Sequence, residues 1–366
     1  MHLRPDRVPI TSESSFFVFP NKLILKTCGT TLNLLGLPRI LAIARTHCGF
    51  AKVWRCFYSR KSFMFPERQI GPHREWRNEV EYLDALFDNG AAYTVGKMNG
   101  DHWLLYMTSP SEAEPSDGGQ TVPIPCHITS SAITLVPATS GQDYTLEILM
   151  TKLGAAGRRP FLFVDDNAAG DSSDPEKVSK AKGALVSCQL GIASIFPPSR
   201  TRLDSYAFDP CGYSANALVD PVSGDEGYYT IHVTPEEGWS YASFECNVPV
   251  HPSPGGSQSE GGDGHDNNGC ESMPDLETLI QHVVNIFQPG HLTLTLFVSN
   301  DMNPHDSIAS THFVNVKEGE GPTSVEVAQR AFKQALIPHG YRRTDKINYE
   351  FGDYDLAFAT FQKSKG

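Results

Sequence analysis

The chain has 366 residues, of which 40% are hydrophobic, and it carries a formal net charge of −12. This length predicts one large domain or two ordinary ones, and the acidic balance disfavours nucleic acid as a partner. No unbroken apolar stretch reaches the ~18 residues of a membrane-spanning helix, and residues 1–15 lack a signal peptide's apolar run. The eight cysteines form no CxxC pair, which argues against a zinc ribbon or disulfide scaffold and indicates a reducing, cytoplasmic compartment.

The chain opens on a hydroxyl-rich turn, Thr-Ser-Glu-Ser-Ser at residues 11–15. Strands are predicted directly after it, at residues 16–19 and 22–26. A helix is predicted at residues 31–45, interrupted at Pro38, because proline cannot donate its share of the helical hydrogen bonds.

The middle of the chain continues with a helix at residues 75–87, where apolar side chains recur at helical spacing. Strands at 92–98 and 103–107 follow, joined by an Asn-Gly-Asp turn that favours a hairpin. Residues 108–140 and 251–272 contain stretches rich in Ser, Pro, Glu and Gly, and we interpret both as disordered surface insertions. A third polar loop covers residues 165–176.

Helices and strands continue to alternate in the C-terminal half. The predicted helices lie at residues 274–287 and 323–336, and the predicted strands at 228–234, 241–246, 292–298 and 356–361. Hairpins separated by amphipathic helices predict an α+β fold, with antiparallel sheets in layers and helices on the outer faces.

Three segments could carry chemistry, each with an ordinary alternative. Ser14 could attack the carbonyl of Glu13 and convert that peptide bond to an ester, although serine-rich turns are common on surfaces. Strand alternation puts His232 on one face with Tyr228 and Thr230, yet a lone histidine on a strand is usually structural. Ser214 is likewise usually a plain loop serine.

Read together, these segments resemble the eukaryotic S-adenosylmethionine decarboxylases. The words that carry the resemblance are Ser-Glu-Ser-Ser (12–15), Leu-Lys-Thr-Cys-Gly-Thr-Thr (25–31), Phe-Tyr-Ser-Arg-Lys (57–61), Pro-His-Arg (72–74), Asn-Gly-Ala-Ala-Tyr (89–93), Thr-Leu-Glu-Ile-Leu-Met (145–150), Pro-Cys-Gly-Tyr-Ser (210–214), Thr-Ile-His-Val-Thr-Pro-Glu (230–236) and Ser-Phe-Glu (243–245). They run in the family's order. The resemblance implies a single domain over residues 1–366, in a four-layer α/β-β/α sandwich whose two antiparallel sheets lie face to face.

The resemblance also implies a self-processing decarboxylase that converts S-adenosylmethionine to its decarboxylated form for spermidine and spermine synthesis. Cleavage between Glu13 and Ser14 would leave residues 1–13 as a short β-chain and 14–366 as the α-chain. Ser14 would become a covalent pyruvoyl group that forms a Schiff base with the substrate, so neither a metal nor PLP is expected. His232 would accept the processing proton, with Ser214 assisting, and Cys28 would be the proton donor in decarboxylation; its ordinary role is a small buried hydrophobe.

For ligands, the resemblance implies that Phe208 stacks on adenine, Glu236 binds the ribose hydroxyls, and Glu13 lies at the substrate site. It further implies putrescine as an activator, and a homodimer is left open. The putrescine region would comprise Lys26, Phe57, Asp143, Thr145, Glu147, Glu245 and Phe297. The alternative for the acidic residues is permanent internal pairing with Lys26 or an arginine.

The sequence departs from the family before the processing motif. Family members carry several dozen residues there, including a first strand segment, whereas thirteen precede Ser14 here. Two explanations are a truncated gene model or alternative start, and a genuine short form. We expect this chain to be less stable than a full-length relative and a poor decarboxylase. The rival hypothesis is an inactive form that regulates a full-length decarboxylase.

Overall fold

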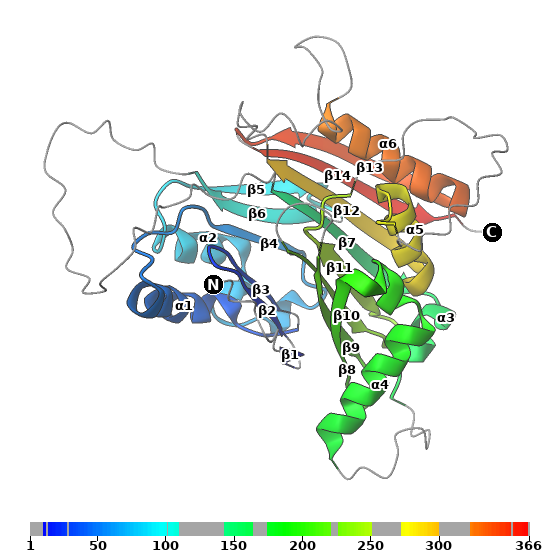
Figure 1. Cartoon of the computed structure of the whole chain (residues 1–366). Coiled ribbons are helices and arrows are strands. Elements are labelled where there is room, and N and C mark those ends of the chain that lie inside the picture. Colours follow the sequence, from blue (N-terminus) through cyan, green and yellow to red (C-terminus); the bar gives the residue numbers. More distant parts are fainter. Residues whose placement is uncertain are drawn as a thin grey trace, which may run out of the picture. The chain divides into compact units, whose positions relative to one another are not determined.

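The computed structural model describes residues 10–11, 14–27, 29–100, 102–109, 143–163, 174–220, 226–250, 272–299, 323–352 and 354–364. The chain divides into two compact units, one formed by Met1–Gly29 with Gly141–Gly366 and the other by Thr30–Ser140 (Figure 1). The insertions predicted at 108–140 and 251–272 lie almost wholly outside the described residues, and the single domain stays a prediction.

The first unit is built on an eight-stranded antiparallel sheet with the order β13-β14-β12-β7-β11-β10-β9-β8. Its strands are β7 (Tyr144–Leu153), β8 (Thr201–Ala207), β9 (Tyr213–Val219), β10 (Gly227–Thr234), β11 (Tyr241–Cys246), β12 (Pro289–Ser299), β13 (Tyr341–Glu350) and β14 (Tyr354–Lys363). Helices α4 (Pro175–Gln189), α5 (Leu276–Phe287) and α6 (Ser324–Leu336) cover one face of it (Figure 1). The short helix α3 (Ala155–Arg158) follows β7.

The main hydrophobic core fills the space between this sheet and its helices. Alternate strand residues such as Ile148, Ile231 and Phe244 pack there against Phe287 of α5 and Phe332 of α6, all fully buried. Because strand side chains alternate between faces, the same strands turn a second set of residues to the opposite face. That opposite face carries the polar side chains Ser214, Asn216, Thr230, His232, Ser243, Glu245, Glu147 and Thr295.

A small sheet of β1 (Ile10–Thr11), β2 (Ser14–Val18) and β3 (Leu23–Thr27) contacts this polar face. In β2, Ser15 and Phe17 are buried while Ser14 and Phe16 alternate to the other side. Phe17 packs on Tyr228 with ring centroids 4.6 Å apart, and Leu218 completes the cluster. The hairpin therefore covers part of the polar face with one apolar anchor, Phe17, and the hydroxyl of Ser15.

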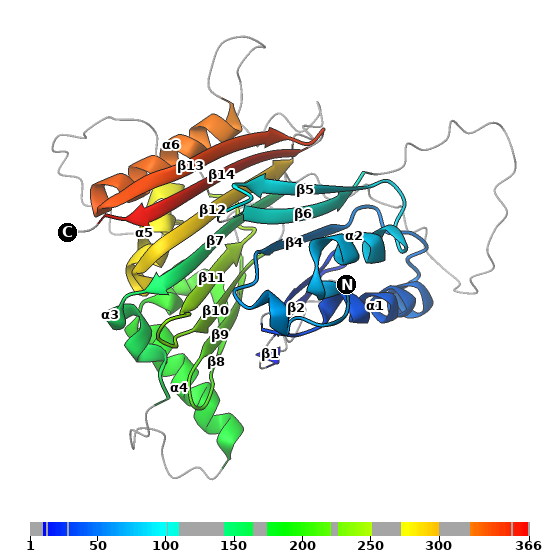
Figure 2. The same ribbon diagram turned by 180° about the vertical axis from the view of Figure 1, so that it is seen from behind.

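The second unit contains the antiparallel sheet β4-β6-β5 and the helices α1 and α2 (Figure 2). Its elements are α1 (Asn33–Cys48), β4 (Phe57–Lys61), α2 (Trp76–Asp84), β5 (Gly90–Gly96) and β6 (His102–Thr108). Leu34, Leu83 and Tyr106 form its core. Glu79, fully buried, accepts hydrogen bonds from Arg60 Nε at 2.8 and 3.0 Å and from the Tyr58 hydroxyl at 2.7 Å, so its charge is compensated inside the unit.

The predicted α+β fold with antiparallel sheets is confirmed, and two details of the helices are corrected. The helix expected to break at Pro38 continues from Asn33 to Cys48 with Pro38 inside it; proline already has a helical φ and removes only one hydrogen bond. Helix α4 was not predicted because its buried positions include Ser179, Gly183 and Ser187 rather than large apolar residues.

Close packing explains the small residues of α4. A Cβ atom on Gly183 would lie 2.7 Å from the backbone of Ser205 in β8, so only glycine permits this approach. Short 3-10 turns connect the remaining elements: η1 (Pro66–Arg68), η2 (Gly71–Arg74), η3 (Arg159–Phe161), η4 (Ile192–Ser194), η5 (Pro198–Arg200) and η6 (Ile337–His339).

Candidate active site

A buried imidazole lies between two serine hydroxyls on the polar face of the large sheet. His232 on β10 has Ser214 Oγ of β9 at 3.0 Å from Nδ1 and Ser15 Oγ of β2 at 2.8 Å from Nε2. The cross-strand register pairs His232 with Ser214 directly, while Ser15 approaches from the overlying hairpin. The structure thus brings together Ser214 and His232, which the sequence predicted, and adds a serine beside the expected cleavage point.

Burial sets the charge of this imidazole. His232 is 3% exposed, and desolvation, aided by the positive charge of Lys26, lowers its pKa to about 4 against a weaker opposing effect of Glu245. The ring is therefore neutral near pH 7, with one bare nitrogen that can accept a proton. Such a group suits a general base better than a permanent cation would.

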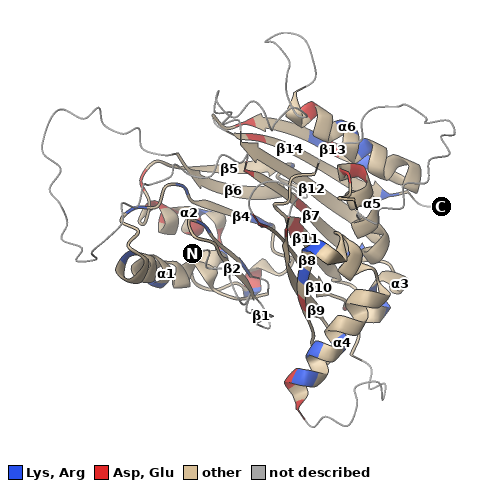
Figure 3. Ribbon diagram, viewed as in Figure 1, with Lys and Arg blue, Asp and Glu red and all other residues tan. Residues whose placement is uncertain are grey.

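A second cluster surrounds Lys26 of β3, which is the cross-strand neighbour of Ser15 in the hairpin. Its Nζ contacts Glu147 Oε1 of β7 at 2.8 Å and Glu245 Oε2 of β11 at 2.5 Å. Tyr228 donates to the other oxygen of Glu245 at 2.6 Å. Acidic residues of β7 and β11 thus stand near the middle of the sheet (Figure 3).

The buried charges of Lys26 and Glu245 stabilise each other. Burial alone would lower the pKa of Lys26, but Glu147 and Glu245 more than offset it and raise that pKa well above its usual value. Burial would likewise raise the pKa of Glu245, and Lys26 with the Tyr228 hydroxyl reverses this and lowers it. Lys26 is thus a cation and Glu245 an anion, and each satisfies the other.

The remaining residues of the predicted putrescine region in this unit extend along β7 and β12. Asp143 accepts a hydrogen bond from the Tyr354 hydroxyl at 2.7 Å, and Phe297 stacks on the Tyr354 ring at 4.7 Å. Thr145 is paired with Phe297 across the strands and shares a face with Glu147. Phe57 lies on β4 and belongs to the second unit.

The predicted substrate residues Phe208 and Glu236 lie at two neighbouring turns of the first unit. Phe208 follows β8, and its ring packs at a tilt against that of Tyr206 with centroids 5.0 Å apart. A Cβ on Gly212 would lie 3.5 Å from both the Phe208 ring and the Val233 carbonyl. Burial first, and the Glu236 carboxylate second, raise the pKa of the Cys211 thiol. Glu236 Oε2 is buried and has no hydrogen-bond partner among the described residues, as expected of an acceptor that serves a ligand.

Two predicted site residues, Glu13 and Cys28, lie outside the described residues. Ser14 begins β2, opposite Thr11 of β1 and Thr27 of β3. Its neighbour Ser15, rather than Ser14 itself, has its hydroxyl on His232. The bond predicted to be cleaved therefore adjoins Ser14, the residue before Ser15, whose hydroxyl contacts His232.

Sequence reasoning missed Ser15, Thr230, Asn216 and Tyr228 as members of these clusters. The signal was present for Thr230 and Tyr228, since strand alternation placed them on the face of His232. No local signal identifies the contacts of Ser15 with residues more than 200 positions away, because they exist only once the hairpin covers the sheet.

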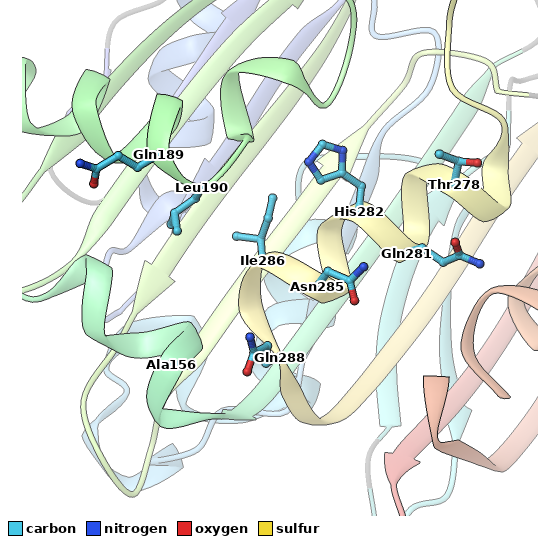
Figure 4. Close-up of a pocket in the computed structure, with 9 residues that line it drawn as sticks. All are labelled: Ala156, Gln189, Leu190, Thr278, Gln281, His282, Asn285, Ile286 and Gln288. Carbon is cyan, nitrogen blue, oxygen red and sulfur yellow. The ribbon is translucent and has the colours of Figure 1, made fainter. Parts of the chain in front are cut away.

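A groove of about 520 Å³ lies elsewhere, where α3, the end of α4 and α5 meet (Figure 4). Its lining is largely neutral: Ala156, Gln189, Leu190, Thr278, Gln281, His282, Asn285, Ile286 and Gln288. None of the predicted site residues reaches it. The residues that the structure describes contain no group of three or more His, Cys, Asp or Glu side chains placed to hold a metal, and no described helix is long and apolar enough to span a membrane.

Comparison with known proteins identifies the family of this chain. The family model described as adenosylmethionine decarboxylase matches residues 10–362. This chain belongs to the adenosylmethionine decarboxylase family. Among curated relatives of that family, the S-adenosylmethionine decarboxylase proenzyme of Saccharomyces cerevisiae is 31% identical over 97% of this chain and 78% of its own length, and that of Drosophila melanogaster is 34% identical over 97% and 81%.

A solved structure of the same family supports the fold. The Trypanosoma brucei AdoMetDC-delta26 monomer superposes with a TM-score of 0.55 at 19% identity, covering 96% of this chain and all of that one. The relatives named proenzymes are made as precursors, and the predicted resemblance of this chain to the decarboxylase family is confirmed.

Proposed function

We propose that this chain is a self-processing, pyruvoyl-dependent decarboxylase of S-adenosylmethionine. The observation that carries the proposal is the neutral, buried His232 held between Ser214 and Ser15, directly beneath the strand that begins at Ser14. The family's proenzyme relatives support the same activity class. The product would be the aminopropyl donor for spermidine and spermine synthesis, and a cytoplasmic homodimer remains a prediction.

Processing needs a nucleophile, a base and an elimination step. The Ser14 hydroxyl would attack the Glu13 carbonyl carbon, the C–N bond would break, and the freed nitrogen would take a proton as an ester forms. His232 would then accept the Ser14 α-proton while the Cβ–Oγ bond breaks and the Glu13 carboxylate leaves with the upstream peptide. Water would convert the resulting dehydroalanine to a pyruvoyl group with release of ammonia. A neutral imidazole is suited to this proton transfer.

The pyruvoyl carbonyl supplies an electron sink for decarboxylation, the role that PLP has in other enzymes. The chain's own residues would orient and protonate the substrate. Phe208 would stack on the adenine, and the unpartnered Glu236 Oε2 would accept from ribose hydroxyls. Glu13 would contact the substrate, and Cys28 would deliver the proton to its α-carbon.

Intact mass tests processing directly. We expect purified protein to yield a fragment starting at residue 14 with the mass of a pyruvoyl rather than a serine terminus, and a Ser14→Ala chain to stay whole. Release of CO₂ from carboxyl-labelled S-adenosylmethionine tests the proposed decarboxylase activity. A cleaved chain that releases no CO₂ would retain the processing assignment and reject the decarboxylase one, whereas an uncut wild-type chain would reject both.

We further propose that putrescine stimulates this activity through the acidic cluster. Lys26 contacts both Glu147 and Glu245, so among the described residues of this cluster one cation faces two carboxylates. A diamine would compensate the excess negative charge. The Lys26 contacts equally support the alternative of permanent internal pairing. Titration with putrescine decides between them: a rise in rate that Glu147→Gln weakens supports the diamine, and a flat response supports internal pairing.

The rival proposal is an uncleaved chain that regulates a full-length decarboxylase. Its support is that Ser15, which cannot supply the pyruvoyl group at residue 14, has its hydroxyl on His232 Nε2. An uncut mass, together with a change in the rate of an active decarboxylase on mixing, would favour this role. Efficient cleavage of the purified chain would remove it.

A further inference from the structure

Five polar side chains form one hydrogen-bonded chain under the hairpin. Asn216 Oδ1 accepts from Thr230 Oγ1 at 2.8 Å, and Thr230 Oγ1 lies 2.9 Å from Ser15 Oγ. Ser15 Oγ lies 2.8 Å from His232 Nε2, and Ser214 Oγ lies 3.0 Å from Nδ1. Every member is at most 3% exposed, so water cannot replace these hydrogen bonds; the Nδ2 of Asn216 has no partner among the described residues.

The proton positions along this chain follow from the acceptor at its end. A side-chain amide oxygen carries no proton, so the single hydroxyl proton of Thr230 is committed to Asn216. Thr230 Oγ1 can then only accept from Ser15. Once the Ser15 proton points to Thr230, the contact between Ser15 and His232 needs a proton on Nε2. His232 Nδ1 is left bare and accepts the Ser214 hydroxyl.

The opposite tautomer of His232, with the proton on Nδ1, leaves no proton between Ser15 and Thr230. If Ser15 donated to a bare Nε2, the Ser15 and Thr230 oxygens would face each other at 2.9 Å with no hydrogen between them. Two buried lone pairs at that distance repel, and a buried acceptor without a donor is costly, at about 1–3 kcal/mol. Turning the Asn216 amide over would reverse the whole chain, so the orientation of this one amide sets the tautomer.

We propose that Asn216, acting through Thr230 and Ser15, is a positioning residue that holds His232 as the Nε2–H tautomer, with Nδ1 as its basic nitrogen. This inference rests on the proposed self-processing function for its catalytic meaning. In this tautomer Nε2–H is a donor on the side of the hairpin that begins at Ser14. Proton uptake by His232 then takes place at Nδ1, so the Ser14 α-proton of the proposed processing step would reach the ring through the Ser214 hydroxyl, which would take that proton and pass its own to Nδ1.

Burial keeps the ring in its neutral form, so that a tautomer exists to be selected. The charged groups that act on it are Lys26 of β3, which disfavours the imidazolium, and Glu245 of β11, which favours it. Neither contacts a ring nitrogen within the described residues: the nitrogens are shared among Ser15, Thr230 and Ser214. The hydroxyl chain therefore selects the nitrogen that carries the proton.

Nitrogen-15 NMR of histidine-labelled protein distinguishes bare from protonated ring nitrogens and tests the assignment. The sample is the full chain with Ser14→Ala, which cannot cleave, and the His232→Asn variant identifies the signal among thirteen histidines. We expect a bare Nδ1 and a protonated Nε2 in the parent. Thr230→Val should mix the two tautomers, since it frees the Ser15 proton, and Thr230→Ser should restore the parent signals. A bare Nε2 in the parent, or unchanged signals in Thr230→Val, would overturn the proposal.

Cleavage rates separate this inference from the function on which it rests. In the cleavable chain, Thr230→Val should slow self-cleavage by on the order of tenfold or more, with Thr230→Ser near the parent rate. The matched control is Thr360→Val, which removes a buried hydroxyl of β14 bonded to Thr344 Oγ1 at 2.7 Å and should leave the rate unchanged. Asn216→Leu is the second variant if Thr230→Val folds poorly. A parent that never cleaves but shows the expected tautomer rejects the proposed function and keeps this inference.

Discussion

One face of the eight-stranded sheet is covered by α4, α5 and α6 (Figure 1) and buries apolar side chains, whereas the other carries an imidazole, hydroxyls and an ion cluster beneath a short hairpin. Both faces come from the same strands, because alternate residues of β7, β9, β10 and β11 point in opposite directions. Alternate residues of one strand therefore serve different roles: those on the helix-covered face contribute to stability, and those on the polar face contribute to the proposed chemistry. We call this alternation residue parity. A substitution on one face should affect folding, and its neighbour in sequence should affect processing.

The largest expected effect is on the polar face. His232→Ala removes the proposed base and should lower the rate of self-cleavage by about 10²–10⁴-fold. The measurement is the fraction of cut chain over time by intact mass. Because the ring is buried and bonded by Ser15 and Ser214, its loss should also lower the thermal midpoint, and cleavage is therefore compared in the folded fraction. Cleavage at the parent rate would show that His232 on the polar face is not the base for self-cleavage.

The matching change on the apolar face should have the opposite signature. Phe332 of α6 is fully buried in the main core, and Phe332→Ala should lower the free energy of unfolding by about 3–5 kcal/mol through lost contacts and a cavity. Urea titration measures it. In the fraction that stays folded, self-cleavage should run at the parent rate. A large loss of cleavage in well-folded protein would show that the core transmits strain to the polar face.

Strands whose side chains alternate clearly between apolar and polar could be predicted from the sequence, and others could not. The segment 228–234 alternates cleanly, so the sides of His232 and Ile231 were predicted correctly, and the strand 241–246 was predicted with its observed bounds. Strand β9 was missed because it is buried on both sides and consists largely of small residues, which have little strand preference. The strand β13 was missed because charged residues alternate along this edge of the sheet.

Contacts between distant segments set the limit for the site. Ser214 and His232 were predicted from family motifs, and the register of β9 with β10 explains why they meet. The approach of Ser15 to His232 and of Lys26 to Glu147 depends on how the hairpin docks on the sheet. No local pattern encodes that docking, and it rests on the packing of Phe17 against Tyr228 and Leu218.

The pH dependence of stability sharpens the comparison. The pKa of His232 falls from its ordinary value of 6.5 to about 4 in the fold, so the unfolded chain binds the proton more readily between those values. Stability should therefore decrease as pH falls from 6.5 towards 4, and this residue should contribute about 3 kcal/mol of the loss. In the Ser14→Ala background, His232→Gln should show a shallower decline by that amount in urea titrations at pH 7 and pH 4. Equal slopes in both chains would contradict the burial of a neutral imidazole.

The smallest expected effect concerns a hydroxyl cluster on the helix-covered face. Ser187 Oγ of α4 bonds the Gly183 carbonyl at 2.7 Å, Ser205 Oγ at 3.0 Å and Tyr213 OH at 2.7 Å. This cluster resembles the one around His232 in burial but contains no imidazole. Ser187→Ala should cost about 1 kcal/mol of stability, because Tyr213 and Ser205 lose one shared partner.

This last change is informative because Tyr213 and Ser214 are adjacent in sequence and point to opposite faces of β9. Ser187→Ala should leave the cleavage rate unchanged, while Ser214→Ala, one residue along the strand from Tyr213, should slow it. The measurement is again the time course of cut chain, with the urea midpoint as the control for folding. If loosening Tyr213 slows cleavage as much as removing the Ser214 hydroxyl, β9 couples its two faces, and residue parity does not separate folding from chemistry.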